Sequence, residues 1–335
     1  MTNPSPLVRK AVPNLGRIQA PVRDRLDQVL QEIRRIVLAD FDMIGAVNDH
    51  LLLQPGKLFR PTLVLLSNEV GGSSRSHAVT FGAAVELVHL ATLVHDDAVD
   101  NSVLRRGQPT VNALWTHQIA IIMGDYLYSR ALTELAESGY LEAIKILGSA
   151  ANAMSVGEMR QLTAYDSLEF SEDDYYRLIA AKTASLMSAA CAMGALGGGE
   201  RYREAFQRFG HNLGMAFQVA DDILDYIGAE EETGKPVGQD LRERKVTLPL
   251  VGALKTATPS AQEEVRRLFT RTDASEEEIL RVLRLVEELG GIAYARRKAQ
   301  EFAEKAEEAL GTLPGRGEAL DALRDSITYA VDRNR

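Results

Sequence analysis

Residues 81–100, with the sequence FGAAVELVHLATLVHDDAVD, decide the expected fold and the place of its charged site. From Phe81 to Val94 this stretch is apolar almost all round, so a helix formed there belongs in the interior. It then changes into the acidic segment Asp96-Asp97-Ala98-Val99-Asp100. A buried helix that runs into clustered carboxylates predicts a helical core with a charged site at its mouth.

The chain on either side of this stretch also favours helices. Between Pro109 and Pro236 lie 126 residues without proline, rich in Ala, Leu, Met and Glu. Ser171–Asp174 and Ser275–Glu278 have the pattern of a capping box, which opens a helix. The alternation typical of strands is scarce. We therefore predict an all-α fold, with one domain over residues 21–335 and a flexible tail over residues 1–20.

Composition excludes several classes of protein. Of the 335 residues, 45% are hydrophobic and 25% are charged, which excludes disordered, collagen-like and coiled-coil rods. The net charge of −9 argues against a general nucleic-acid surface. Cys191 is the single cysteine, so the chain can form no internal disulfide and no thiolate zinc site. The first 20 residues contain no export signal and the chain has no uncharged membrane-spanning run, so we expect a cytoplasmic protein.

A second acidic cluster repeats the first. Gly214–Ala220 runs into Asp221-Asp222-Ile223-Leu224-Asp225, so both clusters have the form Asp-Asp-x-x-Asp, 125 positions apart. On a helix, residues i and i+4 share one face, and two like charges about 6 Å apart cost roughly 3 kcal/mol at a dielectric constant near 20. A single cluster is usually a solvated face, but two that each follow an apolar segment indicate a bound cation. Oxygen ligands alone favour magnesium, shared with substrate phosphates.

Basic residues are spread between and around the clusters. Any one of them alone is typical of a solvated surface, but together they suit a substrate that carries several phosphates, since arginine clamps oxygens bidentately and lysine acts as a point charge. These residues are Lys57, Arg60, Arg105, Arg106, Lys182, Lys235 and Lys245.

On these motifs the sequence resembles the trans-polyprenyl diphosphate synthases, which are head-to-tail prenyltransferases. The resemblance extends from about residue 20 to the end of the chain. The matching motifs, in the order of the family, are Gly56-Lys57-x-x-Arg60-Pro61, Glu86-Leu87-Val88-His89, Asp96–Asp100, Arg105-Arg106-Gly107-x-Pro109-Thr110, Gly124–Leu127, Lys182-Thr183, Phe217–Asp225 and Gly234-Lys235. Leu58 is a departure, since many members have arginine there, and its loss removes one phosphate contact.

The resemblance implies an isoprenoid-synthase-type helical bundle around a deep central cavity, and a role for each motif residue. About three magnesium ions per active site would be held by Asp96, Asp100 and Asp221, with Asp97, Asp222 and Asp225 in the same clusters. The allylic diphosphate would bind Arg105, Lys182 and Lys235, and isopentenyl diphosphate would bind Lys57, Arg60, His89 and Arg106. Lys182, Thr183 and Gln218 would lie at the reacting carbon. Arg333 or Arg335 would close over the second substrate.

The family also links product length to the residues just before the first aspartate, where bulky aromatic side chains form a floor. Here these positions are Ala91 and Thr92, both small. We therefore predict a long-chain product of the quinone side-chain type, beyond geranylgeranyl diphosphate. The alternative is a short-chain synthase, in which a deeper side chain such as Met123, Tyr126 or Tyr128 blocks the tunnel.

Other functions fit less well. A terpene cyclase generally lacks the second Asp-Asp-x-x-Asp and the second basic clamp, and a non-catalytic regulatory subunit would have lost its metal ligands. Glu86 and His89 match the Glu-x-x-His pattern of di-iron bundles, but none of the other five histidines has a glutamate three residues earlier. The catalytic subunit of a heteromeric synthase stays open. By analogy with the family we expect a homodimer, with small-molecule diphosphates as substrates and no nucleic acid or integral membrane segment.

Overall fold

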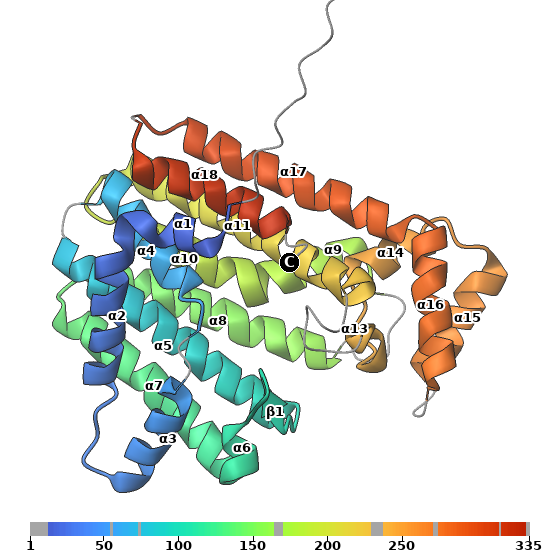
Figure 1. Cartoon of the computed structure of the whole chain (residues 1–335), viewed down its shortest axis with the longest axis horizontal. Coiled ribbons are helices and arrows are strands. Elements are labelled where there is room, and N and C mark those ends of the chain that lie inside the picture. Colours follow the sequence, from blue (N-terminus) through green and yellow to red (C-terminus); the bar gives the residue numbers. More distant parts are fainter. Residues whose placement is uncertain are drawn as a thin grey trace, which may run out of the picture.

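The computed structural model describes residues 13–53, 56–72, 75–163, 170–228, 237–270, 274–314 and 316–332, and nearly all of them are helical. Figure 1 shows the long helices lying side by side in a bundle, with α15 and α16 extending from one end. The elements are α1 (Leu15–Gln19), a 3-10 turn η1 (Ala20–Val22), α2 (Arg23–Ile36), α3 (Asp42–Leu52), α4 (Phe59–Gly71), α5 (Arg75–Val99), β1 (Leu104–Arg105), β2 (Gln108–Pro109), α6 (Val111–Leu114), α7 (His117–Glu137), α8 (Leu141–Thr163), α9 (Glu172–Ile179), a π-helical turn η2 (Ala180–Ala184), α10 (Ser185–Gly194), α11 (Glu200–Ile227), α13 (Gln239–Arg242), α14 (Leu248–Leu254), α15 (Pro259–Thr270), α16 (Glu276–Glu288), α17 (Gly291–Gly311) and α18 (Glu318–Val331). The predicted all-α class is confirmed.

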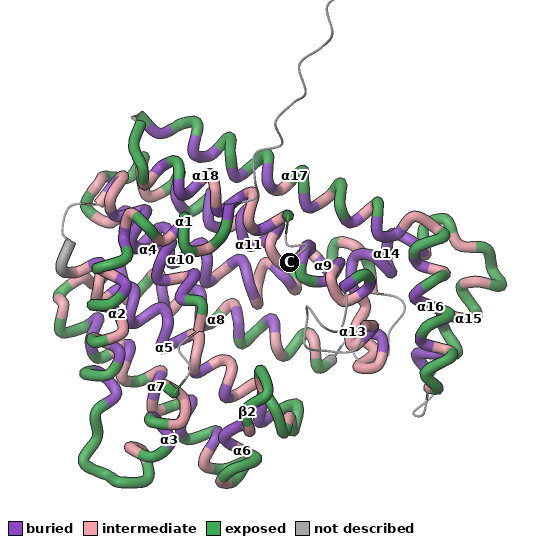
Figure 2. The backbone as a smooth tube through the Cα atoms, viewed as in Figure 1, coloured by how far each residue is buried: buried purple, intermediate pink, exposed green. Residues whose placement is uncertain are grey.

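The apolar helix predicted from residue 81 onward is α5, and it lies inside the bundle. It packs against α2, α4, α7 and α10, and Figure 2 shows α5 and α10 largely buried. Residues 77–99 are long and apolar enough to span a membrane, judged by length and composition alone. However, 61% of the apolar 18-residue stretch within them is buried inside the bundle. Such burial is typical of the core helix of a soluble protein.

Both predicted capping boxes are present. The Ser171 side chain accepts from the backbone N–H of Asp174 at the start of α9, and Ser275 does the same with Glu278 at the start of α16. In each box the acidic side chain accepts in return from the backbone of the serine, so two orphan donors of the helix are satisfied.

The predicted tail over residues 1–20 needs a correction at its end. Asn14 caps a short helix, α1, with its side chain accepting from the backbone N–H of Arg17 at 2.9 Å. Ile18 is fully buried, so this segment is held by packing as well as by its cap. Residues 1–12 lie outside the described part of the chain.

A small antiparallel hairpin follows α5 and carries the Arg105-Arg106 pair. Leu104 pairs with Pro109 and Arg105 with Gln108. Arg106 and Gly107 form the turn, and both have positive φ angles, 52° and 75°. Two positive φ values suit the tight turn of a hairpin.

Candidate active site

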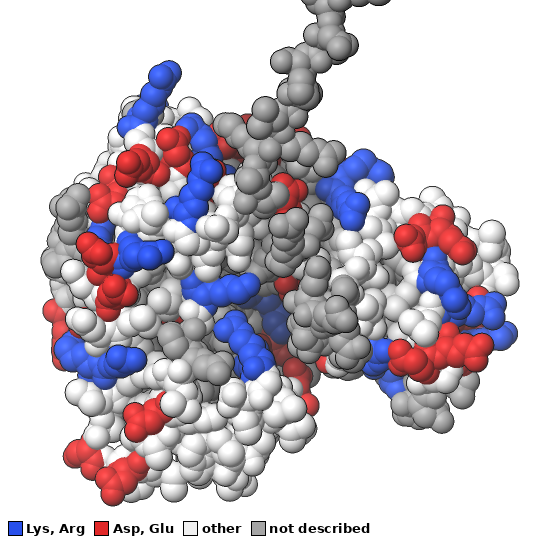
Figure 3. Space-filling model, in the orientation of Figure 1, with Lys and Arg blue, Asp and Glu red and all other residues white. Residues whose placement is uncertain are grey.

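Two adjoining cavities open along the C-terminal half of α5. The first, which we call the aspartate cavity, measures about 390 Å³ and is lined by Asp96 from α5 and by Asp221 and Asp222 from α11. The two acidic clusters therefore share one cavity, although 125 positions separate them in the chain. Figure 3 shows acidic and basic side chains gathered at a hollow in the middle of one face of the molecule.

Asp97, Asp222 and Asp225 accept hydrogen bonds from other segments of the chain or from their own helix. Asp97 accepts from Arg105 Nε at 2.7 Å. The side chain of Asp225 accepts from the backbone N–H groups of Gln239 and Asp240, both at 3.0 Å, and so caps α13. Asp222 is buried and accepts from Tyr175 and Gln218.

Asp96 and Asp221 face the aspartate cavity from different helices, and Asp100 lies one turn beyond Asp96. Burial raises the pKa of Asp96 to about 6, helped by Glu158 and Asp100 and opposed by Lys182 and Arg105. Within the described residues, no three His, Cys, Asp or Glu side chains come close enough to hold a metal ion by themselves. This oxygen donor set fits a hard cation that takes its other ligands from water or phosphate, as magnesium does.

The Lys182-Thr183 pair lies in η2, the π-helical turn between α9 and α10. A Cβ at Gly157 of α8 would lie 2.9 Å from Ala181 Cβ, and one at Gly214 of α11 would lie 2.6 Å from Ala184 Cα. Because neither glycine carries a Cβ, α8 and α11 can both pack closely against this turn. π turns of this kind are frequent at functional sites, and here Lys182 and Thr183 both line the aspartate cavity.

Lys182 is held by two residues of α8 that the sequence analysis did not identify. Its ammonium donates to Gln161 Oε1 at 2.8 Å and pairs with Glu158. Neither residue belongs to a motif that we recognised, and only their spacing of three on a helix places them on one face. Asp240 and Tyr175 also line the aspartate cavity, although no sequence motif pointed to them.

Four polar side chains form a hydrogen-bonded chain along the wall of the aspartate cavity. Thr183 Oγ1 donates to Gln218 Oε1 at 2.7 Å, and Gln218 Nε2 donates to Asp222 Oδ1 at 2.8 Å. Tyr175 donates its hydroxyl to Asp222 Oδ2 at 2.6 Å. Burial raises the pKa of Asp222 to about 7, and the two hydrogen bonds it accepts act in the opposite direction.

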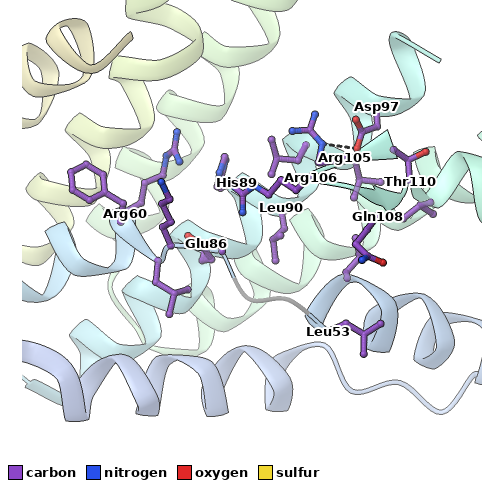
Figure 4. A pocket seen from close by; sticks show the side chains of 18 of the residues that line it. Leu53, Arg60, Glu86, His89, Leu90, Asp97, Arg105, Arg106, Gln108 and Thr110 are labelled. Atoms are coloured by element: carbon purple, nitrogen blue, oxygen red, sulfur yellow. Dashed lines mark hydrogen bonds and ion pairs between the residues drawn. The ribbon is translucent and has the colours of Figure 1, made fainter. Parts of the chain in front are cut away.

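The second cavity, which we call the arginine cavity, measures about 490 Å³. It is lined by Lys57, Arg60, His89 and Arg106, the residues expected to form a basic clamp. Figure 4 shows Arg60 and Arg106 approaching His89 from opposite sides. Burial, followed by the charges of the neighbouring arginines, lowers the pKa of His89 well below its usual value, so the imidazole is neutral at pH 7.

Arg60 is half-buried, and its buried Nε has no hydrogen-bond partner among the described residues. Glu86 faces Arg60 and Arg106 in the same cavity, and burial raises its pKa against the effect of both arginines. A guanidinium with a buried, unused donor suits an anion, and diphosphate oxygens have the geometry to accept from it.

The two cavities share part of their walls. Arg60, His89, Leu93 and Arg105 line both of them. An anion bound in one cavity would therefore lie beside an anion bound in the other. This juxtaposition brings two substrates together in a fixed orientation.

The residues expected to set the product length lie in different parts of the structure. Thr92 lines the aspartate cavity, whereas Ala91 is buried in the core and does not line it. Met123 is buried, and the Tyr126 hydroxyl donates to the backbone carbonyl groups of Val37 and Leu38. Lys235, Arg333 and Arg335 lie outside the described residues.

Comparison with known proteins agrees with this geometry. The family model described as polyprenyl synthetase matches residues 42–286. An all-trans-nonaprenyl-diphosphate synthase (geranyl-diphosphate specific) from Rhodobacter capsulatus is 36% identical, with 94% of this chain and 97% of that protein covered. The heptaprenyl diphosphate synthase component 2 of Bacillus subtilis is 33% identical, with 93% and 89% covered.

A solved structure is similar over nearly its whole length. It is a Caulobacter crescentus polyprenyl synthase complexed with calcium and isoprenyl diphosphate, 34% identical, with a TM-score of 0.91 and with 97% of this chain and 100% of that chain covered. With the family model, the relatives and this fold in agreement, the chain belongs to the polyprenyl synthetase family.

Proposed function

We propose that the protein is a magnesium-dependent prenyltransferase that condenses isopentenyl diphosphate head-to-tail onto an allylic diphosphate and so builds a long-chain trans-polyprenyl diphosphate. The observation that carries the proposal is the shared wall between an acidic cavity and a basic one. A reaction between two diphosphates needs two anion sites that touch, and only one of them needs metal ions to activate a leaving group.

The proposed metal ligands are the carboxylates that face the aspartate cavity or extend its rim, namely Asp96, Asp100 and Asp221. Bound magnesium would neutralise the negative charge that develops on the departing diphosphate. Asp97, Asp222 and Asp225 support this arrangement through Arg105, Gln218 and the α13 backbone. The resemblance implies the same division, since it assigns the magnesium ions to Asp96, Asp100 and Asp221.

The residues of this chain supply the rest of the chemistry. Lys182 and Arg105 bind the allylic diphosphate, while Lys57, Arg60, His89 and Arg106 hold isopentenyl diphosphate. The allylic C–O bond breaks, and its electron pair leaves with diphosphate. The double bond of isopentenyl diphosphate then forms the new C–C bond, and the released diphosphate takes up the proton lost from the adjacent carbon. Apolar side chains such as Leu93 exclude water from the cation.

We propose a long-chain product because the cavity wall below Asp96 carries the small side chain of Thr92. The Rhodobacter relative is a nonaprenyl synthase by name, which supports the same length class. One observation favours a second arrangement: the Bacillus relative is a component of its enzyme, so a heteromeric synthase is the alternative to a chain that works alone.

We also propose a cytoplasmic homodimer. Apolar side chains are exposed on neighbouring helices, Ile121 and Ile122 on α7 and Val156 and Met159 on α8. A second copy of the chain is the partner that would cover them.

The deciding experiment incubates the purified chain with labelled isopentenyl diphosphate, MgCl₂ and, in separate reactions, dimethylallyl, geranyl, farnesyl or geranylgeranyl diphosphate. We expect products well beyond twenty carbons with at least one starter, and loss of turnover when EDTA removes the metal. Turnover that resists EDTA contradicts the metal assignment. Absence of product with every starter contradicts a chain that works alone and favours the heteromeric alternative.

A further inference from the structure

The hydrogen-bonded chain from Tyr175 to Thr183 has a fixed direction. Gln218 Nε2 donates to Asp222 Oδ1 at 2.8 Å, and only the NH₂ end of an amide can donate, so this end of Gln218 faces Asp222. The carbonyl end of the same amide then faces Thr183, which donates to it at 2.7 Å. The Thr183 proton is therefore engaged with Gln218, and the lone pairs of its oxygen are left for the aspartate cavity.

This chain begins at Tyr175, outside the two aspartate motifs. Tyr175 is almost fully buried on α9, and its hydroxyl satisfies the second oxygen of Asp222 at 2.6 Å. With both oxygens engaged, the Asp222 carboxylate cannot rotate without losing a buried hydrogen bond, which is costly. Gln218 and Asp222 are four residues apart on α11, so the helix itself holds their separation.

We propose that Tyr175 is a positioning residue that acts through Asp222 and Gln218 to keep the Thr183 oxygen lone pairs, and not its proton, directed at the allylic carbon as that carbon becomes positive. The proposal rests on the proposed function, because it needs a cation in the aspartate cavity. A dipole fixed in advance stabilises charge that develops during the reaction more than charge present before it, so the effect belongs to turnover rather than to substrate binding.

The chain offers a matched control in the next residue. Tyr176 also lies on α9, and its hydroxyl donates to Glu172 Oε1 at 2.6 Å. Tyr176 does not line either cavity. Tyr175→Phe and Tyr176→Phe thus each remove one tyrosine hydroxyl from adjacent positions. Only the hydroxyl of Tyr175 belongs to the hydrogen-bonded chain that ends at Thr183.

The experiment measures kcat and the KM of both substrates for the two Phe variants, each made in the wild type and in Thr183→Val. For Tyr175→Phe we expect kcat to fall about 10- to 100-fold, by analogy with lost supporting contacts at metal sites, with each KM within about threefold of wild type. Tyr176→Phe should keep the wild-type kcat. In Thr183→Val, where no hydroxyl is left to orient, Tyr175→Phe should cost nothing further, because residues that act through one another are not additive.

Asp222→Asn gives a second variant if Tyr175→Phe does not fold, as judged by circular dichroism and thermal unfolding. It keeps the side-chain shape but lets the Gln218 amide turn round, so its loss of kcat should also be smaller in Thr183→Val. The inference is overturned if the loss is unchanged in Thr183→Val, or if Tyr176→Phe lowers kcat equally. A wild-type chain without prenyl transfer overturns the proposed function and this inference together, whereas an active wild type with additive variants overturns this inference alone.

Discussion

Asp96 and Asp225 both belong to an Asp-Asp-x-x-Asp cluster, yet their carboxylates meet different neighbours. Asp96 lies in a cavity wall, while Asp225 accepts from two backbone N–H groups at the start of α13. The Asp-Asp-x-x-Asp pattern does not show the cap formed by Asp225, because hydrogen bonds to a segment 14 residues later leave no periodic signal. The hydrogen-bond partners of each aspartate therefore distinguish the proposed metal ligand, Asp96, from the helix cap, Asp225.

We predict that Asp96→Asn lowers kcat/KM at least about 100-fold with little change in thermal stability, because a metal ligand loses its charge. Asp225→Asn should instead cost about 1 kcal/mol of unfolding free energy and lower activity less, because an amide oxygen replaces only part of the cap. Steady-state kinetics with a magnesium titration, together with urea denaturation of each variant, tests both statements. Equal losses of activity would show that Asp225 is a ligand as well.

At the scale of elements, the sequence predicted the helices but not the π-helical turn between α9 and α10. The capping boxes at Ser171 and Ser275 depend on residues three apart, which the sequence displays directly. The π turn over Ala180–Ala184 carries no such signal. Its close neighbours are backbone positions on other helices, at Gly157 and Gly214, so it becomes visible only when the helices are assembled.

Gly157→Ala tests this close approach. Its Cβ would lie 2.9 Å from Ala181 Cβ and 3.0 Å from Lys182 Cγ, so the turn must shift, and we expect activity to fall about 10- to 100-fold. Gly148→Ala on the same helix is the control, because its Cβ meets nothing within 4 Å. The control should gain up to about 1 kcal/mol of stability from helix propensity at unchanged activity, and Gly157→Ala should not. Enzyme assays and thermal unfolding of both variants decide the matter, and matching behaviour would contradict the prediction.

The depth of the aspartate cavity belongs to the same scale, because α5 forms its wall. A tyrosine at Thr92, whose side chain lines the cavity, should shorten the product by several isoprene units. We expect Ala91→Tyr to shorten it as well, although this residue lies in the packed core and the larger side chain will also reduce stability. Chromatography of the dephosphorylated products gives the length directly. Unchanged length in Thr92→Tyr would place the floor deeper in the bundle.

For the whole molecule, the sequence indicated that two distant clusters meet, and it could do so because each follows an apolar helix that has to be buried. It could not indicate that the arginine cavity shares Arg60 and His89 with the aspartate cavity, since that depends on how α4 packs beside α5. Long-range packing of this kind is set by the fit of side chains from several helices, which a periodic pattern does not encode.

The outer face of α7 and α8 is where the whole molecule would meet a second copy. The two helices are joined by a short turn at Gly139 and run antiparallel, so residues equally far from that turn lie side by side. Ile122 and Val156 each lie 17 residues from Gly139, and Met159 lies about one turn further along α8. Ile122 and Met159 are 61% and 63% exposed. Apolar side chains gathered on one face in this way are typical of an interface between subunits.

We therefore predict that the wild type has twice the chain mass of 36.7 kDa in solution, and that Ile122→Glu combined with Met159→Glu gives the monomer mass. Leu280→Glu on α16 is the control, because it places the same charge on an exposed leucine away from α7 and α8. Sedimentation velocity measures all three proteins, with circular dichroism to establish that each is folded. A monomeric wild type, or a control that dissociates as readily as the double variant, would contradict the assignment of this face. Dissociation of the double variant alone would identify α7 and α8 as the interface, because two charges buried without partners cost more than the apolar contact contributes.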